Sequence, residues 1–360
     1  MKHIGIDARL LFQTGVGTYI QNLLHHIPSY TPQDVYFTIY CLPQDAEFIK
    51  NEVPESTIHT TTALWHSWQE QTEFLSCINK DNLDLMHFTY FGHPIFYQRN
   101  YISTIHDITP LLYKTGRAST KNQLLYAIKH SAFSYVLKNQ VEQSKAIITP
   151  TKTVKDQLIS LYGESIESKI YPIYEGVSYR LLVEQGSENS IKNPYLLYVG
   201  NFYPHKNVEF LIKAFVKSNS RYSLVLAGPN DYFLKRILSS LSEKEKQSII
   251  IKEKLSLSEL ATLYKHAEAL IHPSISEGFG LPIVEAMHFG IPIIASHIPV
   301  FQELLGTSYY SFDPFVESSI RGAISRFEKE KDVKINEISE KFSFPEMTKK
   351  TMDLYLRHAQ

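Results

Sequence analysis

Residues 268–296, EALIHPSISEGFGLPIVEAMHFGIPIIAS, hold two short apolar runs on either side of a helix-like segment. The runs 268–274 and 291–296 have the length of buried strands. Gly278 and Gly280 form a loop after the first run, and Pro282 suits the first turn of the helix that follows. A strand, a crossover helix and a second strand normally join parallel neighbours in one sheet. We therefore expect a parallel sheet covered by helices.

The same alternation continues on both sides of this stretch. Further strands are expected at 3–8, 35–42, 83–88, 101–106, 146–150, 169–176, 195–201, 222–229 and 248–255, with helices that include 17–27 and 121–139. Residues 178–194 are polar and lack periodicity, which is typical of a linker. The pattern predicts an α/β protein with two Rossmann-like, doubly wound parallel-sheet domains, 1–177 and 195–344, facing each other across a cleft, and a last helix at 345–360.

Composition argues against several classes of protein. The 360 residues include 36 Lys and Arg against 37 Asp and Glu, so we expect no nucleic-acid partner. Two cysteines are too few for a disulfide scaffold or a zinc cluster. No apolar run approaches the roughly 18–20 residues of a membrane span, and the first residues lack the apolar core of a signal peptide. We expect a soluble, cytoplasmic protein.

The two glutamates of the opening stretch pose the main functional question. Paired carboxylates can act on one bond as acid and base, but they can also hold two ends of one ligand. Glu277 precedes the glycine loop, and Glu285 falls near the first turn of the helix, with the backbone N–H groups of Phe279, Gly280 and Leu281 between them. Each acid alone has a local explanation, as a loop cap or as a complement to the helix dipole. Together they favour a ligand that spans the junction.

Lys206 stands near the start of the helix that follows the strand at 195–201. A cation at this end opposes the helix macrodipole, which is worth roughly 0.3–1 kcal/mol. A lysine about 4 Å from a phosphate charge gains on the order of 4 kcal/mol at an effective dielectric constant near 20. The position of Lys206 therefore favours a lysine that binds an anion over a lysine that is only exposed to solvent.

Gly15 and Gly17 stand at the mouth of the first helix. They indicate either a phosphate or sugar loop or a tight turn. A dinucleotide fingerprint is disfavoured because Ile20 occupies the position of its third glycine.

His106 ends the strand at 101–106, where parallel α/β sheets place their ligands. It either donates a hydrogen bond to a sugar hydroxyl or is a packed histidine held by Asp107. His87 and His93 nearby fit structural or acceptor-facing positions better than a zinc site.

The stretch 273-PSISEGFGLPIVEAMHFGIPIIAS-296 resembles the E-x7-E signature of retaining GT-B glycosyltransferases (family 4, group 1). The resemblance covers nearly the whole chain and is closest to the bacterial mannosyltransferase branch. It is carried, in the family's order, by IGIDARLL, TGVGTYIQNLL, TIHDITPL, AIITPTKTVKDQL, VGNFYPHKNVEFLIKAF, LSELATLYKHAEALIHPS and FDP.

The resemblance implies a role for each matched residue. Glu277 would contact the donor sugar, Glu285 the ribose, and Lys206 the diphosphate. His106 would contact the sugar near its 6-hydroxyl. The remaining donor contacts would come from Gly15, Gly17, Lys254, Leu255, Phe279, Gly280 and Leu281, with Lys254 and Leu255 near the base. Asn201 stands where many members carry an arginine, which leaves less positive charge for the diphosphate. The helix 345–360 would pack back on the first domain.

The implied activity is metal-independent transfer of a hexose with retention, best matched by mannose from GDP-mannose to a hydroxyl in cell-surface polysaccharide or lipopolysaccharide synthesis. No D-x-D metal motif is present, and no cofactor is expected. Alternatives are a UDP-sugar donor, a non-hydrolysing nucleotide-sugar epimerase, a glycosidase with both glutamates on one bond, and a non-catalytic nucleotide-sugar-binding protein.

A basic stretch within 114–155 raises the question of membrane contact. It fits either a peripheral surface at the inner face of the membrane for a lipid-linked acceptor, or a solvated face with its aromatic residues in the core. Its members are Lys114, Arg117, Lys121, Lys129, Lys138, Lys145, Lys152 and Lys155, interleaved with Tyr126, Phe133 and Tyr135.

Overall fold

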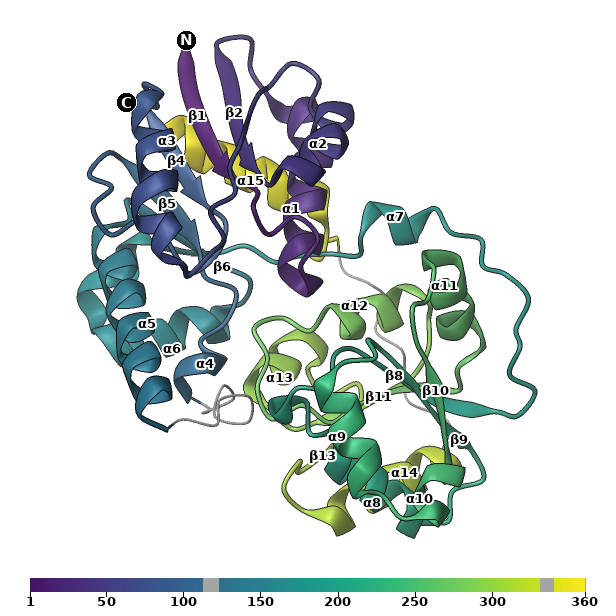
Figure 1. The fold of residues 1–360 in the computed structure, drawn as a ribbon. Coiled ribbons are helices and arrows are strands. Elements are labelled where there is room, and N and C mark those ends of the chain that lie inside the picture. The colour runs from purple at the N-terminus through teal and green to yellow at the C-terminus, as the bar shows by residue number, and fades with distance from the viewer. Residues whose placement is uncertain (113–122, 331–339, 360) are drawn as a thin grey trace. The chain divides into compact units, whose positions relative to one another are not determined.

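The computed structural model describes residues 1–112, 123–330 and 340–359, without the side chains of 112 and 123–129. The chain forms two compact units (Figure 1). Unit 1 contains Met1–Leu112, the described part of Thr120–Glu175, and the segment from Ser343 onward. Unit 2 contains the described part of Gly176–Phe342.

Unit 1 is built on a parallel seven-stranded sheet in the order β3-β2-β1-β4-β5-β6-β7. Its first strand, residues Lys2–Asp7, pairs on both sides, and Ile4 and Ile6 are fully inaccessible, as expected for a strand covered on both faces. The strands are β1 (Lys2–Asp7), β2 (Val35–Cys41), β3 (Thr57–Thr60), β4 (Leu85–Phe88), β5 (Tyr101–Thr104), β6 (Ala146–Thr149) and β7 (Ile170–Pro172).

Amphipathic helices connect these strands. In α6 the side chain of Thr151 caps the first turn by accepting a hydrogen bond from the Val154 N–H. The helices are α1 (Thr14–His26), α2 (Ala46–Glu52), α3 (Leu75–Lys80), α4 (Thr109–Leu112), α5 (Gln123–Gln143) and α6 (Lys152–Tyr162), with short turns η1 (Ile27–Tyr30), η2 (Pro43–Asp45), η3 (Glu70–Phe74, a π-helix) and η5 (Glu164–Lys169).

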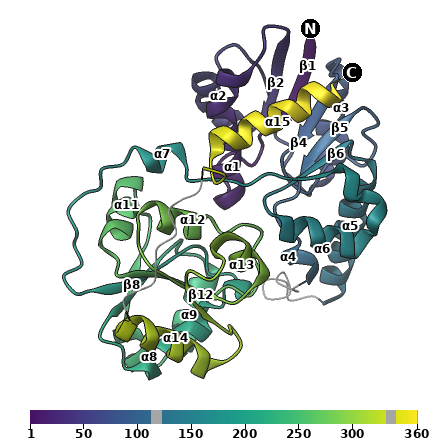
Figure 2. The same ribbon diagram turned by 180° about the vertical axis from the view of Figure 1, so that it is seen from behind.

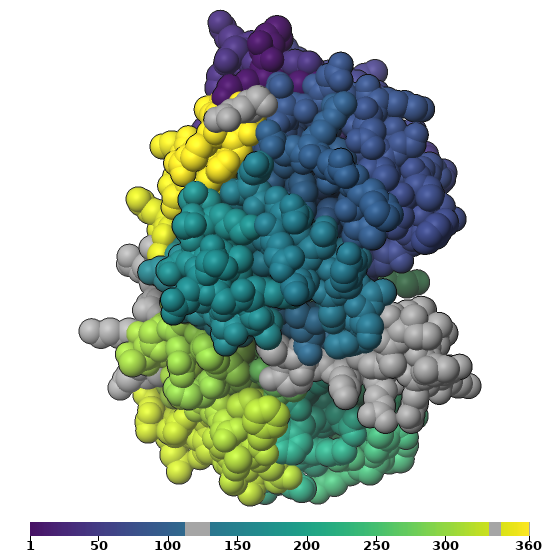
Figure 3. All heavy atoms as spheres, turned by 90° about the vertical axis from the view of Figure 1, so that its left-hand side faces the viewer, coloured from purple at the N-terminus to yellow at the C-terminus, as the bar shows by residue number. Residues whose placement is uncertain are grey.

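The last helix, α15 (Phe344–His358), belongs to unit 1 although the chain of unit 2 precedes it. Lys2 donates to the carbonyl of Leu356 at 2.5 Å, and the Tyr355 hydroxyl lies 2.7 Å from His87 Nδ1. Figure 2 shows α15 beside α1, and Figure 3 shows it in yellow against the purple and blue N-terminal residues. The two ends of the chain therefore meet in one core.

Unit 2 has a parallel six-stranded sheet in the order β10-β9-β8-β11-β12-β13. The strands are β8 (Tyr195–Val199), β9 (Ser223–Ala227), β10 (Ile249–Lys252), β11 (Ala269–His272), β12 (Ile293–Ser296) and β13 (Tyr310–Phe312). The connecting segments are α7 (Tyr179–Leu182), η6 (Pro204–Lys206), α8 (Val208–Ser218), α9 (Tyr232–Ser240), α10 (Glu243–Gln247), α11 (Leu257–His266), α12 (Leu281–His288), α13 (Pro299–Leu305) and α14 (Glu317–Glu330).

The two all-parallel sheets confirm the predicted fold class. The sequence pattern does not predict two edge strands, β3 and β13. The residues of β3 are only half-buried or exposed, and β13 is three residues long, so neither carries a clear apolar pattern.

The segment 178–194 differs from a simple linker. It begins with α7 and then follows unit 2, where the Ser187 N–H donates to Thr262 on α11 at 2.5 Å. Lys265 of the same helix donates to the Gln185 carbonyl at 2.5 Å. These polar contacts give the segment a fixed path that its composition does not reveal.

Candidate functional site

The clearest site lies in unit 2, where the loops after β8 and β11 meet. These strands are direct neighbours, so parallel pairing brings their carboxyl ends to one edge of the sheet. The turn η6 follows β8 and ends with Lys206, while the loop with Glu277 follows β11. A hydrogen bond of 2.9 Å from the Ile275 N–H to the His205 carbonyl joins the two loops. This edge collects most of the residues that the sequence predicts.

Lys206 and Glu277 form an ion pair at 2.6 Å, with side chains 15% and 10% exposed. His272, the last residue of β11, lies 3.0 Å from the same carboxylate oxygen, Oε1. Burial alone would raise the pKa of Glu277, but Lys206 and His272 together hold it well below its ordinary value. Glu277 is thus a carboxylate, and it is itself the anion beside Lys206 in this structure.

The loop between Glu277 and α12 presents free backbone donors. Among the described residues, no acceptor is assigned to the N–H groups of Phe279, Gly280 and Leu281, whereas the Ile283 N–H already bonds the Gly280 carbonyl at 2.9 Å. Gly280 has a φ of +97°, and a Cβ there would meet the Phe301 ring at 2.9 Å. Glycine is therefore required for this turn, and a helix N-terminus with unpaired donors is suited to an anion.

Glu285 is the fifth residue of α12, close to the first turn of the helix. Its Oε2 accepts a hydrogen bond of 2.5 Å from the Tyr264 hydroxyl on α11. Burial raises the pKa of Glu285 to about 7, and the bond from Tyr264 only partly opposes this rise. No cation is paired with Glu285 in the described part of the chain, so its charge state differs from that of Glu277.

Lys254 and Leu255 follow β10, the edge strand of the same sheet. Two strand spacings separate β10 from β8, which amounts to about 10 Å. Lys254 is exposed and has a φ of +50°. The predicted base contacts therefore stand at the same edge as Lys206 but some distance from it.

Asn201 follows β8, and its hydrogen bonds among the described residues are local. Its carbonyl accepts from the Tyr198 hydroxyl at 2.5 Å, and its side-chain oxygen accepts from the Tyr203 N–H at 3.4 Å. The amide adds no charge, so Lys206 carries the positive charge of this loop.

In unit 1, Gly15 and Gly17 lie within the first turn of α1. A Cβ on Gly17 would meet the Leu11 carbonyl oxygen at 2.6 Å, so this glycine allows the helix to pack closely on the preceding loop. Gly15 is exposed. Close packing explains Gly17 without a ligand, and the contact of both glycines with a diphosphate stays a prediction.

His106 is buried and bonded on both ring nitrogens. Nε2 lies 3.0 Å from the Thr89 carbonyl, and Nδ1 lies 3.1 Å from Glu175 Oε1. Asp107 instead accepts from the Thr109 N–H at 2.8 Å, so it is not the residue that holds the histidine. The Thr89 carbonyl can only accept, so the Nε2 N–H of the ring is donated to it. A hydrogen bond between Nδ1 and Glu175 then needs a second proton, either on Nδ1 or on the carboxyl group. The sugar contact of His106 stays a prediction.

Sequence reasoning missed two partners that the fold supplies. Glu175 follows β7 and reaches His106 across the sheet. Arg9 is buried between Asp7 and Glu70, at 2.7 and 2.8 Å, and its guanidinium lies 3.7 Å from the centre of the Phe74 ring. The spacing of Asp7 and Arg9 after β1 is visible in the sequence, but Glu70 is too distant to pair by inspection.

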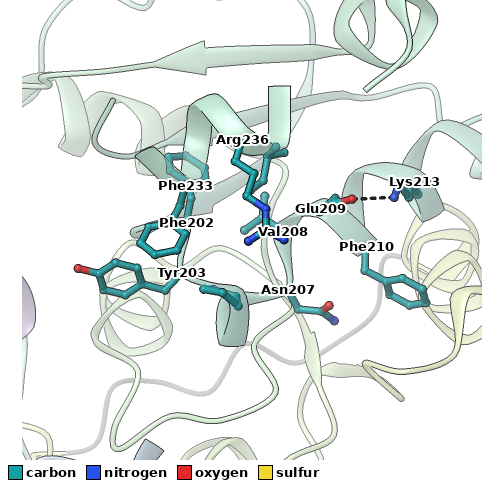
Figure 4. Close-up of a pocket in the computed structure, with 11 residues that line it drawn as sticks. Phe202, Tyr203, Asn207, Val208, Glu209, Phe210, Lys213, Phe233 and Arg236 are labelled. Atoms are coloured by element: carbon teal, nitrogen blue, oxygen red, sulfur yellow. Dashed lines mark hydrogen bonds and ion pairs between the residues drawn. The ribbon is translucent and has the colours of Figure 1, made fainter. Parts of the chain in front are cut away.

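A separate pocket of about 230 Å³ lies where η6, the start of α8 and the start of α9 meet (Figure 4). Phe202, Tyr203 and Phe233 form an aromatic wall, and Arg236 extends toward Val208. None of the site residues predicted from the sequence lines this pocket. It is therefore distinct from the Glu277 site.

The described residues contain no group of three His, Cys, Asp or Glu side chains placed to hold a metal ion. Metal independence stays a prediction. Likewise, no helix in the described ranges is both long and apolar enough to cross a membrane.

The basic stretch is only partly described. Lys114, Arg117 and Lys121, together with the side chains of Lys129 and Tyr126, lie outside the described residues. Lys138 pairs with Glu142 at 3.7 Å, Phe133 packs against the core, and Tyr135 is 61% exposed. Membrane contact by this stretch stays a prediction.

Family models match both halves of the chain. Glycosyltransferase Family 4 matches residues 13–180, and Glycosyl transferases group 1 matches 184–342. The O-antigen chain mannosyltransferase RfbU of Salmonella typhimurium is 34% identical over 260 residues, which are 71% of this chain and 69% of that protein. O-antigen chain mannosyltransferase B of Escherichia coli is 26% identical over 235 residues, 59% of this chain and 57% of that protein.

Solved structures share the fold. Sucrose-phosphate synthase from Thermosynechococcus elongatus has a TM-score of 0.76 at 16% identity, with 99% of each chain covered. Anabaena HepE in complex with UDP-glucose has a TM-score of 0.72 at 13% identity, covering 99% of this chain and 100% of that one. This chain is therefore a GT-B glycosyltransferase of group 1 and family 4, in the bacterial mannosyltransferase branch.

Proposed function

We propose that the protein transfers mannose from GDP-mannose to a saccharide or lipid-linked saccharide hydroxyl, with retention of anomeric configuration and without a metal ion. The relatives named as O-antigen chain mannosyltransferases support the sugar and the pathway class. The observation that carries the mechanism is the half-buried Lys206–Glu277 pair beside the N–H groups at the start of α12.

The main barrier is the charge that develops on the leaving diphosphate and on the sugar. Lys206 and the N–H groups of Phe279, Gly280 and Leu281 would meet the diphosphate charge, because preorganised donors stabilise charge without reorientation. A lysine about 4 Å from a phosphate supplies on the order of 4 kcal/mol at an effective dielectric constant near 20. Lys206 would exchange part of its contact with Glu277 for the phosphate.

The two glutamates would hold different parts of the donor. Glu277, held as a carboxylate, would accept hydrogen bonds from sugar hydroxyls. Glu285 would accept from the ribose hydroxyls, and the loop of Lys254 and Leu255 would border the base. The donor contacts of Gly15, Gly17 and His106, all in unit 1, stay predictions from the sequence.

In the transfer itself, the bond from the anomeric carbon to the β-phosphate oxygen breaks and a bond to the acceptor oxygen forms on the same face. The acceptor proton passes to a leaving phosphate oxygen. The bonds and protons of this step balance without a protein nucleophile or a metal ion. The residues named above therefore act by binding the donor and by stabilising charge.

Calorimetry with GDP, UDP and ADP, followed by turnover with the matching sugars and NMR of the product anomer, tests the proposal. We expect GDP to bind most tightly, GDP-mannose to be consumed only with an acceptor, and the rate to survive excess chelator. Tighter binding of UDP would contradict the proposed base, and conversion of the donor without an acceptor would contradict transfer. An inverted product would contradict retention, and complete loss of activity in chelator would contradict metal independence.

Two variants test the residue assignment. We expect Glu277→Ala and Lys206→Ala each to lower turnover at least tenfold, because each removes a group that acts on the reacting sugar phosphate. Lys213→Ala in the same unit, which breaks an exposed pair with Glu209, is the matched control. Near-normal turnover in both site variants would remove the assignment.

A further inference from the structure

His272 is a buried residue of the site for which the sequence motif gives no role. It ends β11, is completely inaccessible, and its ring stacks on Tyr198 of the neighbouring strand at 5.6 Å with an interplanar angle of 17°. Phe301 packs on it at 5.5 Å and 65°. Packing by two aromatic rings fixes the orientation of the imidazole.

The two ring nitrogens have different surroundings. Nε2 lies 3.0 Å from Glu277 Oε1, whereas Nδ1 is buried and has no hydrogen-bond partner among the described residues. A charged imidazolium would bury one N–H with no acceptor, beside the Lys206 ammonium. The neutral ring with its proton on Nε2 leaves only a lone pair unsatisfied. In agreement, burial lowers the pKa of His272, although Glu277 opposes this.

Glu277 Oε1 therefore accepts from two groups, Lys206 Nζ at 2.6 Å and His272 Nε2 at 3.0 Å. Only the lysine is charged. If Lys206 is drawn toward a phosphate, the carboxylate loses its flexible partner but keeps the rigid one. No hydrogen bond is assigned to Glu277 Oε2 within the described residues, which leaves that oxygen for a ligand.

We infer that His272 is a positioning residue: its neutral Nε2–H tautomer holds Glu277 Oε1, so that Oε2 stays directed at the donor sugar while Lys206 serves the diphosphate. This inference rests on the proposed function for its catalytic consequence. The tautomer and the hydrogen bond do not depend on it.

Substitutions at His272 separate positioning from packing. Glutamine can place an amide N–H where Nε2 stands, whereas asparagine reaches only the Nδ1 position and leucine offers no donor. We expect His272→Leu and His272→Asn to lower kcat at least tenfold, and His272→Gln to recover at least half of the wild-type kcat. GDP affinity should change less than about twofold in all three, since His272 does not touch the nucleotide in this scheme. Equal kcat in the glutamine and leucine variants, or a parallel loss of GDP affinity, would overturn the inference.

A direct measurement uses ¹⁵N-histidine-labelled protein, with the His272 signals assigned by their absence in His272→Gln. We expect the neutral Nε2–H tautomer from pH 6 to 8. A charged ring at pH 7 would overturn the inference even in an active enzyme. If the wild type turns over no donor sugar, the proposed function is wrong. The NMR measurement still tests the tautomer of His272 independently of turnover.

Discussion

Glu277 and Glu285 belong to one short motif and are both half-buried, but their surroundings differ in the group that faces the carboxylate. Glu277 faces the Lys206 ammonium at 2.6 Å. Glu285 faces the neutral hydroxyl of Tyr264 at 2.5 Å. The pKa of the first is lowered and that of the second is raised to about 7. Burial raises the pKa of both, so the difference comes from the partners of Glu277, first the Lys206 ammonium and then the His272 ring, which have no counterpart beside Glu285 among the described residues.

The two residues consequently couple folding to pH with opposite signs. Glu277 has a lowered pKa, so its contribution to the free energy of unfolding is present above pH 4.5 and is lost as the pH falls toward the folded-state value. Glu285 has a raised pKa, so its favourable contribution is present below pH 4.5 and is lost as the pH rises through about 7.

The largest effect is expected for Glu277→Gln at pH 8, which leaves the Lys206 charge without its carboxylate. We expect the free energy of unfolding to fall by up to about 3–5 kcal/mol, the cost of breaking a fully buried ion pair from one side, because this pair is half-buried. Urea denaturation measures it. The double variant Lys206→Met/Glu277→Gln should regain much of the loss, and a double variant as unstable as the single one would show that the pair does not set the charge of Glu277.

Glu285→Gln should have the opposite effect, because it removes a carboxylate that is costly to ionise in the folded protein. A rise of the pKa from 4.5 to about 7 corresponds to roughly 3 kcal/mol at pH 8. We expect the variant to be more stable than the wild type by up to this amount at pH 8, and nearly equal to it at pH 5. The same urea titration at both pH values decides, and a loss of stability at pH 8 would contradict the raised pKa.

Nucleotide affinity should depend on the charge of Glu285 if it binds the ribose as a carboxylate. With a pKa of about 7, the ionised fraction grows about tenfold between pH 6 and pH 8, and we expect GDP to bind about tenfold more tightly at pH 8. Calorimetry at the two pH values measures this, with Glu285→Gln as the variant whose affinity stays flat. The same slope in Glu285→Gln would assign the effect to another group.

The smallest effect is expected for Tyr264→Phe. The Tyr264 hydroxyl lowers the pKa of Glu285 against the larger effect of burial, so its removal should raise that pKa further. We expect the midpoint of the pH dependence of GDP binding to move upward by up to about one pH unit. Tyr309→Phe, a buried tyrosine elsewhere in unit 2, is the control. A downward shift would show that Tyr264 does not donate to Glu285.

Much of the fold could be predicted from the sequence because buried parallel strands appear in it as apolar runs. Eleven of the strands, including β8 and β11 at the site, overlap expected segments. The edge strand β3 could not be found in this way, since its residues are half-buried or exposed and its place depends on pairing with β2. The path of 178–194 was equally hidden, because its contacts with Thr262 and Lys265 are polar and lie far away in the chain.

Glu277 and Glu285 can be assigned to different elements from the sequence, because Gly278, Gly280 and Pro282 end a strand, turn the chain and begin a helix. The sequence also places Lys206 after a strand. Which side chains meet at this edge depends on the three-dimensional fold. Lys206 and Glu277 are distant in sequence and become partners because β8 and β11 are adjacent in the sheet. Charge state depends on burial and on a partner within a few ångströms, and both are set by packing rather than by spacing along the chain.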